Sequence, residues 1–394
     1  MNRSDYFNQY WKNINSLPIQ QKQYLMNFGM GMPPSQIFTT PEIILQKLHE
    51  SIEKGDYNRY IPTEGEQELL HEIAYFENSR LPSERQIYTA DHVMIVPGGI
   101  QAFSLLTEAL LKPSDEVLVP NPSYFSLAAL TEMRYQDRTV PAQELNFTAY
   151  AYNNAFTLKT KLAWFCQPNN PTGLYIKSKE LSEIIQKAAS FNSYIVLDES
   201  CDNFVYDSQY RHPSNIVDGH VIRIRTFSKD PNLAGYRLGY IVAPPSIISK
   251  LKKLAPLLYG NPNVMALRAV LTELQIKNGH FSNEDYTETI AYNYSLMKRM
   301  RDFLYTNLLA SRFVDTVILP DACYYMLARL DYPKGSSDFS NALLKYELLD
   351  VVPGTLFGLP EQETWIRMCF ARDQKFLEKA LAKLEKVLLK GKAL

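Results

Sequence analysis

The sequence predicts an α/β protein in which a large domain, with a mainly parallel sheet sandwiched by helices, is joined by a smaller α+β domain. Three observations indicate this fold class. From about residue 90, apolar runs rich in β-branched residues alternate with segments of helical periodicity. Several of these runs end in glycine, asparagine or aspartate, as strands do at the ligand-binding edge of a parallel sheet. After about residue 280, the alternation gives way to a long helical segment, further strands and a closing helix.

The change of pattern also sets the expected domain division. We expect the large domain to span residues 40–280. Residues 281–394 form the expected small domain, and residues 1–39 are expected to pack on it because they lack the strand–helix alternation of the middle region.

The expected elements follow one another along the chain in a regular order. The run "HVMIVPGG" ends in a glycine turn and is followed by "IQAFSLLTEALLK", which has helical periodicity. The expected strands of the large domain are residues 92–99, 116–120, 162–168, 194–199 and 221–227, and the expected helices are residues 100–112, 123–134 and 179–191. In the small domain, expected helices at 286–310 and 374–390 flank expected strands at 323–330 and 365–371.

The charge balance argues against two classes of partner. Lys and Arg number 41 against 42 for Asp and Glu, which gives a formal net charge of -1. A nucleic-acid-binding protein or a protein that binds anionic membrane surfaces normally carries a basic patch. No apolar run reaches the roughly 18 residues that a membrane-spanning helix needs. We therefore expect small-molecule or protein partners, with no nucleic acid and no membrane.

Cysteine and histidine usage predicts a cytoplasmic protein without a metal site. The four cysteines are scattered, with no CxxC pair, which fits a reducing compartment. The N-terminal segment lacks the apolar core and flanking basic residues of a signal peptide. The six histidines show no HExxH or other metal-ligand spacing, so we expect no bound metal.

Small and polar residues follow three of the expected strands. "PGGIQA" places two glycines at a strand-to-helix turn, where backbone N–H groups favour an anion, although a tight turn without a ligand has the same pattern. "QPNNPTG" contains Asn170, which belongs either to a plain turn or to a site where its amide binds a ligand oxygen. Asp198, in "VLDES", either caps the next segment or faces a cationic ligand.

Four further residues have both a structural and a functional interpretation. Tyr124, in "NPSYF", is either a core residue or a surface on which a planar ring stacks. Arg367 interrupts the apolar run "WIRMCFA", and a buried arginine needs an anionic partner, either in a structural ion pair or in a ligand. "TFSKDPNLAGYRLGY" contains Lys229 and, eight residues on, Arg237. These two charged side chains either take part in a binding site or simply lie on a solvent-exposed surface.

In their order along the chain, these motifs resemble those of the fold-type I pyridoxal-phosphate enzymes, and specifically the class I/II aminotransferases. The resemblance runs from about residue 28 to the C-terminus and is carried by "QPNNPTG", "DES", "SKDPNLAGYRLGY", "PGTLFG" and "WIRMCFA". It implies a PLP-transferase-like fold with pyridoxal 5'-phosphate as cofactor. It also implies an enzyme that moves an amino group between an L-amino acid and a 2-oxo acid.

The resemblance implies a role for each residue that matches a family motif. Lys229 would form the Schiff base with the cofactor aldehyde and later carry the α-proton. Asp198 would pair with the pyridine nitrogen, Asn170 would reach the ring hydroxyl, and Tyr124 would stack on the ring. The implied phosphate-binding residues are Gly98, Gly99, Ile100, Thr226 and Arg237.

The resemblance also implies a substrate site and a second subunit. Arg367 would bind the substrate α-carboxylate in a bidentate fork, and Asn170 and the backbone of Gly31 would lie beside the substrate. Tyr60, in "NRYIPTEG", matches a tyrosine that reaches the phosphate of the neighbouring subunit. A homodimer with shared active sites is therefore implied.

Three positions depart from the family pattern, and one is Pro97, where many members place a serine or threonine on the phosphate. Cys201 stands where the family usually has a tyrosine whose hydroxyl bonds the cofactor's ring oxygen. Because a thiol is a weak donor, we expect the Schiff base at Lys229 to keep its proton to a higher pH than in a typical aminotransferase. Asp230 follows the lysine in "KDPN", where an aromatic–glycine pair is common. An aspartate there also occurs in family branches that catalyse elimination or ring closure.

Two other functions stay open from the sequence. The first is pyridoxal-phosphate-dependent elimination, replacement or cyclisation of an amino acid, which would use the same Lys229, Asp198 and Arg367. The second is a non-enzymatic regulator with an aminotransferase-like domain. The sequence disfavours a regulator, because no basic helix-turn-helix pattern precedes the family motifs. The substrate side chain stays open, since no arginine is obviously placed for a second carboxylate.

Overall fold

The computed structural model describes residues 3–81, 87–141, 145, 148–208, 210, 219–229 and 232–391. Within these ranges, its largest sheet has seven strands in the order β2-β8-β7-β6-β5-β3-β4. Strand β8 is antiparallel to both of its neighbours, and the strands from β7 to β4 are parallel. Their bounds are β2 (Val93–Val96), β3 (Glu116–Asn121), β4 (Gln136–Pro141), β5 (Thr160–Cys166), β6 (Tyr194–Asp198), β7 (Val221–Thr226) and β8 (Gly239–Val242). The mainly parallel sheet predicted from the strand–helix alternation is confirmed.

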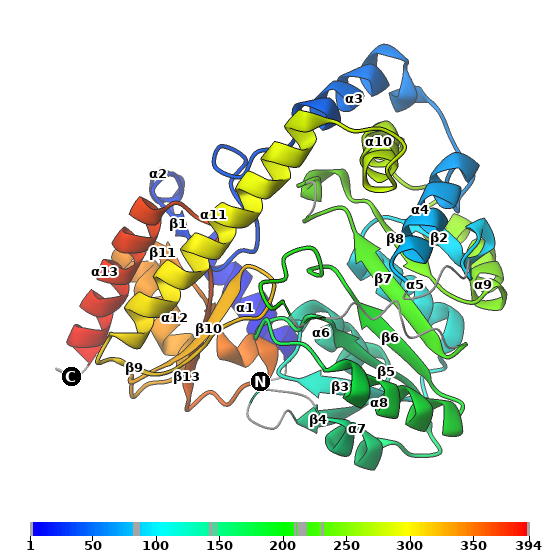
Figure 1. Cartoon of the computed structure of the whole chain (residues 1–394). Coiled ribbons are helices and arrows are strands. Elements are labelled where there is room, and N and C mark those ends of the chain that lie inside the picture. The colour runs from blue at the N-terminus through cyan, green and yellow to red at the C-terminus, as the bar shows by residue number, and fades with distance from the viewer. Residues whose placement is uncertain are drawn as a thin grey trace.

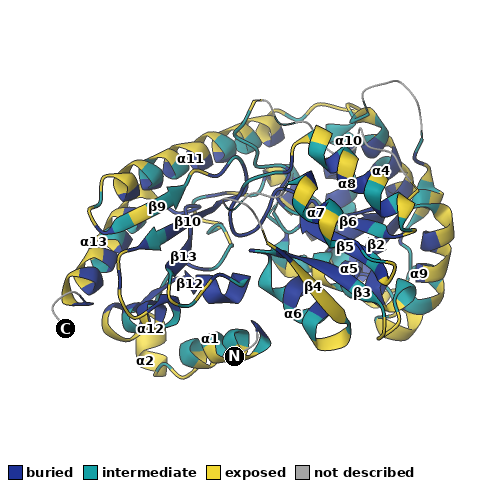
Figure 2. Cartoon of the chain, turned by 90° about the horizontal axis from the view of Figure 1, so that it is seen from below, coloured by how far each residue is buried: buried dark blue, intermediate teal, exposed yellow. Residues whose placement is uncertain are grey.

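Helices cover both faces of this sheet because its strands are apolar on both sides (Figure 1). Successive residues of a strand point to opposite faces. Val196 of β6 packs with helices α5, α6 and α9, whereas Ile195 and Leu197 pack with α7 and α8. Figure 2 shows β5 and β6 buried between these layers. The helix bounds are α5 (Gly99–Leu110), α6 (Phe125–Arg134), α7 (Ala149–Ala155), α8 (Ser178–Ser190) and α9 (Pro245–Leu258).

A third apolar cluster covers the β2–β8 end of the sheet. Val93 and Ile95 of β2 and Tyr240 and Val242 of β8 pack there against three helices. These are α3 (Glu42–Glu53), α4 (Gln67–Ser79) and α10 (Leu267–Lys277). These helices and strand β8 were not among the elements expected from the sequence.

The C-terminal region forms a separate antiparallel sheet with its own apolar core. Its four strands, counted in the described residues, have the order β12-β13-β10-β9. The long helix α11 extends from this sheet toward α10, and α13 packs beside it (Figure 1). The bounds are β9 (Val314–Ile318), β10 (Tyr325–Leu330), β11 (Leu349–Asp350), β12 (Val352–Pro353), β13 (Thr364–Cys369), α11 (Glu284–Leu309), α12 (Ser336–Glu347) and α13 (Gln374–Gly391).

Part of the N-terminal segment joins the C-terminal region. Strand β1 (Met26–Asn27) pairs in parallel with β11, and Phe28 and Phe38 belong to the C-terminal core. Helix α1 (Arg3–Asn15) contacts both α6 and the short helix η6 (Gly354–Phe357). These contacts support the grouping of residues 1–39 with 281–394, and we propose that this unit and residues 40–280 are two domains.

The remaining short helices lie in connecting segments. They are α2 (Ile19–Lys22), η1 (Asp56–Asn58), η2 (Ala90–His92), η4 (Ala234–Tyr236) and η5 (Val264–Ala266). Among the described residues, no helix is both long enough and apolar enough to cross a bilayer. The same part of the chain has no cluster of three or more His, Cys, Asp or Glu side chains that could hold a metal ion.

Candidate active site

The carboxyl ends of three parallel strands bring the predicted site residues together. Cys166 of β5 is in register with Asp198 of β6, and Asp198 is in register with Ile224 of β7. The segments that follow these strands therefore lie side by side at one edge of the sheet, where a cavity of about 170 Å³ opens. The predicted residues that line it are Gly99, Ile100, Tyr124, Asn170, Asp198, Cys201, Thr226, Lys229 and Arg237.

Lys229 lies in the wall of this cavity, three residues after the end of β7. Its side-chain nitrogen Nζ donates to the carbonyl of Gly31 at 3.0 Å and lies 5.3 Å from the ring centroid of Tyr324. The hydroxyl of Tyr324 donates to the same carbonyl at 3.1 Å. Burial lowers the pKa of Lys229, because removing water disfavours the charged form. A lowered pKa makes this amine more available as a nucleophile or as a base.

Asp198 is a buried carboxyl group at the end of β6. It accepts hydrogen bonds from the backbone N–H of Ser200 at 3.1 Å, from the Ser200 hydroxyl, and from the thiol of Cys166 at 3.7 Å. Burial raises the pKa of Asp198 despite these donors. A cationic nitrogen placed in the cavity would favour the charged carboxylate again, so Asp198 suits a ligand with a protonated ring nitrogen.

The opposite end of the cavity has the donors of an anion site. Helix α5 begins at Gly99, and Gly98 before it has a φ of 86°, in the left-handed region that favours glycine. A Cβ atom at Gly98 would lie 3.0 Å from Nη2 of Arg237, so the guanidinium approaches this turn closely. The hydroxyls of Thr226 and Ser228 are 2.8 Å apart at the same end. A helix N-terminus, a guanidinium and two hydroxyls form a donor set that fits a phosphate group.

Arg367 and Asn170 form a pair beside the cavity. Nη1 of Arg367 donates to the side-chain oxygen of Asn170 at 2.8 Å, and Nη2 donates to the carbonyl of Gly29 at 2.8 Å. The guanidinium lies 4.1 Å from the ring centroid of Tyr325 and 4.9 Å from that of Phe357. Its buried Nε has no hydrogen-bond partner among the described residues. Among the described residues, the two terminal nitrogens of Arg367 donate to neutral oxygens and not to a carboxylate, so its charge is available to an anionic ligand.

Gly31 lies directly against the side chain of Tyr325. A Cβ atom at Gly31 would overlap the Tyr325 hydroxyl and ring, so only glycine fits at this position. Tyr325 also lines the cavity, and the carbonyl of Gly31 binds Lys229. The segment around Gly31 thus contacts both Lys229 and Tyr325, the residue whose ring lies against Arg367.

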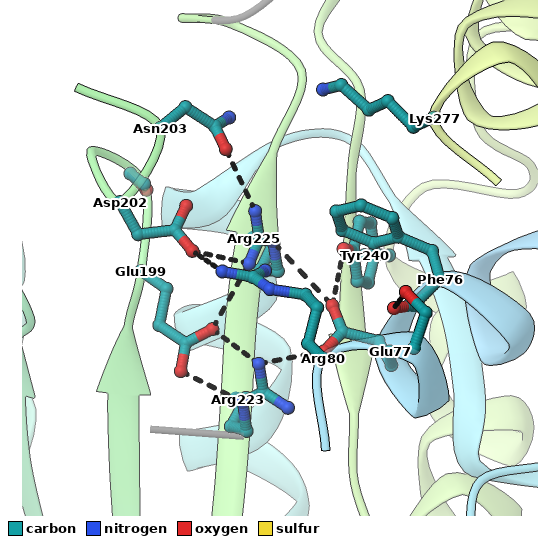
Figure 3. A network of polar contacts seen from close by, with 12 residues as sticks. Phe76, Glu77, Arg80, Glu199, Asp202, Asn203, Arg223, Arg225, Tyr240 and Lys277 are labelled. Atoms are coloured by element: carbon teal, nitrogen blue, oxygen red, sulfur yellow. Dashed lines mark hydrogen bonds and ion pairs between the residues drawn. The ribbon is translucent and has the colours of Figure 1, made fainter. Parts of the chain in front are cut away.

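A buried ion network fixes the segment that follows Asp198 (Figure 3). Strand β7 carries Arg223 and Arg225 on one face, because alternate residues of a strand share a face. Arg223 forms two hydrogen bonds with Glu199, at 2.9 and 2.8 Å, and an ion pair with Glu77 at 2.8 Å. Arg225 donates to Asp202 at 2.5 Å. Arg80, Asn203 and Tyr240 also form hydrogen bonds with members of this network. The network positions the loop that carries two cavity residues, Ser200 and Cys201.

Cys201 and Tyr124, two predicted cofactor contacts, both lie in the cavity wall. Cys201 is buried and lines the cavity at the position where the family resemblance implies a tyrosine. Tyr124 precedes helix α6, and burial raises the pKa of its hydroxyl. Ring stacking by Tyr124 stays a prediction.

Tyr60 is the predicted site residue that lies apart from the others. Its side chain is 94% exposed, and it is not among the described residues that line the cavity of its own chain. The neighbouring Arg59 is held by Asp56 at 2.8 Å and Glu66 at 2.6 Å. The predicted contact of Tyr60 with another subunit stays a prediction. Asp230 and Pro231 lie outside the described residues.

Several cavity residues were not predicted from the sequence. They are Cys166, Pro168, Ser200, Ser228, Ala234 and Tyr325. Ser200 and Ser228 lie within the motifs "VLDES" and "TFSKDPNLAGYRLGY", and Cys166 directly precedes "QPNNPTG", so their position at a strand end was a usable signal. Tyr325 had no such signal, because it comes from the separate C-terminal sheet.

Comparison with known proteins places the chain in a family. The sequence model of the family described as aminotransferase class I and II matches residues 23–384. The chain is 27% identical to an aspartate aminotransferase of Sulfolobus acidocaldarius, with 92% of this chain and 90% of that protein covered. It is 26% identical to aromatic-amino-acid aminotransferase 2 of Thermococcus litoralis, with 93% and 92% covered. An aromatic aminotransferase structure from Pyrococcus horikoshii matches with a TM-score of 0.82 at 25% identity, covering 98% of this chain and 100% of that one.

Proposed function

Because this chain belongs to the class I and II aminotransferases and has pyridoxal 5'-phosphate as its cofactor, we propose that Lys229 binds that cofactor covalently and carries the transfer of an amino group from an L-amino acid to a 2-oxo acid. One observation carries the assignment of Lys229. Its side chain lines the same cavity as Asp198 and Arg237, which suit the two ends of this cofactor.

The cavity residues fit the cofactor by their chemistry. The N-terminus of α5, Thr226, Ser228 and Arg237 supply donors for a phosphate. Asp198 supplies the buried carboxylate that favours a protonated pyridine nitrogen. When bound, pyridoxal phosphate supplies an electron-accepting ring that stabilises negative charge at the α-carbon of the amino acid.

Arg367 orients the amino acid in this proposal. Its guanidinium can form two parallel hydrogen bonds with an α-carboxylate, and the aromatic rings of Tyr325 and Phe357 hold it in place. Asn170 already binds Nη1 of Arg367 and also lines the cavity. These two residues therefore place the carboxylate at one side and leave the α-carbon near Lys229.

Lys229 moves the α-proton once its amine is free. It accepts a proton only when neutral, and burial lowers its pKa in that direction. The carbonyl of Gly31 holds its nitrogen at 3.0 Å in the present geometry. A fixed amine beside the α-carbon lets one residue accept the α-proton and later release it.

We also propose a homodimer in the cytoplasm. A side chain as exposed as Tyr60, on a segment held by the Arg59 ion pairs, supports a contact with a second copy of the chain. All four cysteines are buried and free, which supports a reducing compartment. Sedimentation of the holoenzyme tests the dimer, and a monomer at micromolar concentration would contradict it.

The test of function is a half-reaction with purified holoenzyme. An amino acid is added without any 2-oxo acid, and the cofactor form and the organic products are measured. Amino transfer predicts one equivalent of 2-oxo acid and conversion of the cofactor to pyridoxamine phosphate. Elimination or cyclisation instead predicts continuous product without that conversion, and replacement predicts the same once a nucleophile is added. Lys229→Ala is the control, and normal turnover by this variant would overturn the assignment of Lys229.

A further inference from the structure

Helix α1 lies before the residues that the family model matches, yet it packs beside the candidate site. It spans Arg3–Asn15, whereas the match begins at residue 23. Tyr10 of α1 packs against an apolar cluster that contains Phe357. The ring centroid of Phe357 lies 4.9 Å from the guanidinium carbon of Arg367. Helix α1 therefore borders the group of side chains that surrounds Arg367.

The hydroxyl of Tyr10 binds a buried carboxyl group. It donates to Asp350, at 2.8 Å from Oδ1 and 3.0 Å from Oδ2. Asp350 is the last residue of β11 and is 3% exposed. Burial and the neighbouring Asp350 carboxyl group raise the pKa of Tyr10, so its hydroxyl keeps the proton that it donates. This bond fixes α1 to a strand 340 residues further along the chain.

Gly29 connects this carboxyl group to Arg367. Its backbone N–H donates to the carboxyl group of Asp350, and its carbonyl accepts from Nη2 of Arg367 at 2.8 Å. A Cβ atom at Gly29 would lie 2.8 Å from Oδ2 of Asp350 and 2.9 Å from the side chain of Val352, so the backbone packs closely against both. The position of the Gly29 carbonyl, and of the guanidinium bonded to it, therefore depends on Asp350.

Asp350 also supplies negative charge near Arg367. Burial raises the pKa of Asp350 to about 6, while the hydrogen bond from Tyr10 and the positive charge of Arg367 act to lower it. At neutral pH the carboxyl group is therefore mostly ionised. A buried guanidinium needs compensating negative charge. Asp350 supplies it while Nη1 and Nη2 of Arg367 stay bonded to neutral oxygens of Asn170 and Gly29.

We propose that Tyr10 and Asp350 are positioning residues for Arg367, and that helix α1 is therefore part of the substrate site. Asp350 fixes Gly29, whose carbonyl orients the guanidinium, and Tyr10 fixes Asp350. The inference rests on the proposed function, because it requires Arg367 to bind the α-carboxylate of the amino acid. Bidentate binding of a carboxylate depends on the direction in which the planar guanidinium points. Loss of the Tyr10 hydroxyl should therefore weaken substrate binding more than it slows the reaction of bound substrate.

Tyr10→Phe is the principal test, because it removes the hydroxyl and keeps the ring. Steady-state kinetics are measured on the holoenzyme with phenylalanine, leucine, aspartate and alanine as amino donors. For the best donor, we expect KM to rise by about threefold or more, with a smaller change in kcat. Tyr6→Phe is the matched control, because Tyr6 lies on the same helix and packs against the same cluster, whereas Asp350 is bonded by Tyr10. Equal KM values in the two variants would overturn the role of Tyr10.

A double-variant comparison separates positioning from a general loss of packing. Asp350→Ala removes both acceptor oxygens and should raise KM at least as much as Tyr10→Phe. Asp350→Asn keeps one acceptor oxygen, so its KM should lie between those of the parent enzyme and Asp350→Ala. In the Asp350→Ala background, Tyr10→Phe should have no further effect on KM, because the hydroxyl acts through that carboxyl group. Additive effects of the two substitutions would contradict the proposed chain of contacts.

A binding measurement gives a readout apart from turnover. 3-Phenylpropanoate and succinate carry the carboxylates of phenylalanine and aspartate without the amine, so calorimetry on the holoenzyme reports carboxylate binding alone. We expect the tighter of the two probes to bind Tyr10→Phe about threefold or more weakly than it binds the parent enzyme or Tyr6→Phe. The affinity for pyridoxal phosphate should be the same in all three proteins. A matching loss of cofactor affinity in Tyr10→Phe would indicate general structural damage and would count against positioning.

The outcomes separate this inference from the proposed function. If no amino acid converts the cofactor in the half-reaction, the proposed function fails whatever the variants do. If neither probe binds the parent holoenzyme, Arg367 is not a carboxylate site and the inference fails with it. If amino groups are transferred but Tyr10→Phe matches Tyr6→Phe in KM and in probe binding, the inference fails alone. Circular dichroism and urea unfolding of each variant confirm that the fold is kept before the constants are compared.

Discussion

Lys229 and Gly31 are 198 residues apart in the chain, yet Nζ of Lys229 donates to the carbonyl of Gly31 at 3.0 Å. Tyr324 donates to the same oxygen at 3.1 Å. This shared acceptor connects the lysine to the segment that packs against Tyr325 and Arg367. The position of the amine therefore depends on residues from both the N-terminal segment and the C-terminal sheet.

Gly31→Ala should impair the enzyme by moving this carbonyl. The new Cβ would overlap Tyr325, so either the segment or the tyrosine must shift. A misplacement of about 1 Å at a reacting group can cost about 100-fold in rate, and we expect a loss of that order in kcat/KM. Gly219→Ala is the control, because a Cβ there meets nothing within 4 Å. Equal activity of the two variants would show that the Gly31 carbonyl does not position Lys229.

Arg367→Lys should weaken amino acid binding. Lysine keeps the positive charge but loses the planar fork and the stacking on Tyr325. We expect kcat/KM for amino acids to fall by about 10- to 100-fold, mainly through KM, as the loss of a charged hydrogen bond implies. Arg329→Lys is the control, since Arg329 forms two long ion pairs, both at 3.7 Å. An unchanged KM in Arg367→Lys would remove Arg367 from the substrate site.

Cys201→Tyr should change the pH titration of the holoenzyme spectrum. The hydroxyl would give the ring oxygen of the bound cofactor a stronger hydrogen-bond donor than the thiol does. We expect the pH midpoint of the change in visible absorption to be lower in Cys201→Tyr than in the parent enzyme. The same midpoint in both proteins, or a parent midpoint well below neutrality, would contradict the predicted effect of the thiol.

Asp350 should make stability fall as pH rises. Burial raises its pKa from 3.8 to about 6, although Tyr10 donates to it at 2.8 Å. The folded state therefore binds more protons than the unfolded state between about pH 4 and pH 6, and stability decreases across that window. A shift of this size corresponds to about 3 kcal/mol. Urea unfolding of Asp350→Asn at pH 4.5 and 7.5 should show a smaller decrease than the parent protein, and parallel pH profiles would contradict this.

Glu77→Ala should destabilise the fold through the buried network. Glu77 pairs with Arg223 at 2.8 Å and accepts from Tyr240 at 2.7 Å. Removing one partner of a buried ion pair costs about 3–5 kcal/mol because the other charge is left uncompensated. The exposed pair of Arg134 and Glu108, at 3.5 Å, is the comparison, and Arg134→Ala should cost less than about 1 kcal/mol in the same urea titration. Similar costs for both variants would show that Glu77 contributes no more than a surface charge.

Many residues that line the candidate site could be predicted because they lie in short motifs at strand ends. Asn170, Asp198 and Lys229 each follow an apolar run, and the ends of parallel strands meet at one edge. The same local reasoning did not identify β8, a strand of four residues, or the helices that cover the β2–β8 end of the sheet. A strand of four residues is too short for its hydrophobic periodicity to distinguish it from a helix or a loop.

Contacts between distant segments could not be predicted in this way. Arg367 and Asn170 are 197 residues apart, and nothing in either motif indicates the other. Arg223 and Arg225 read as charges within an apolar strand, but their partners come from α4 and from the loop after β6. A second cavity of about 400 Å³ is likewise lined by four separate segments, which meet only in the folded chain: residues 33–39, residues 203–204, Lys229 with Asn232, and residues 286–297.

The sequence by itself determined the fold class and the residues of the candidate site, because alternating apolar patterns and strand-end motifs are local properties of the chain. The tertiary structure alone decided which carbonyl holds Lys229, which amide holds Arg367, and that an apolar space opens beside the lysine. These depend on packing between segments up to two hundred residues apart, because the side chains of those segments exclude water and one another only in the folded chain.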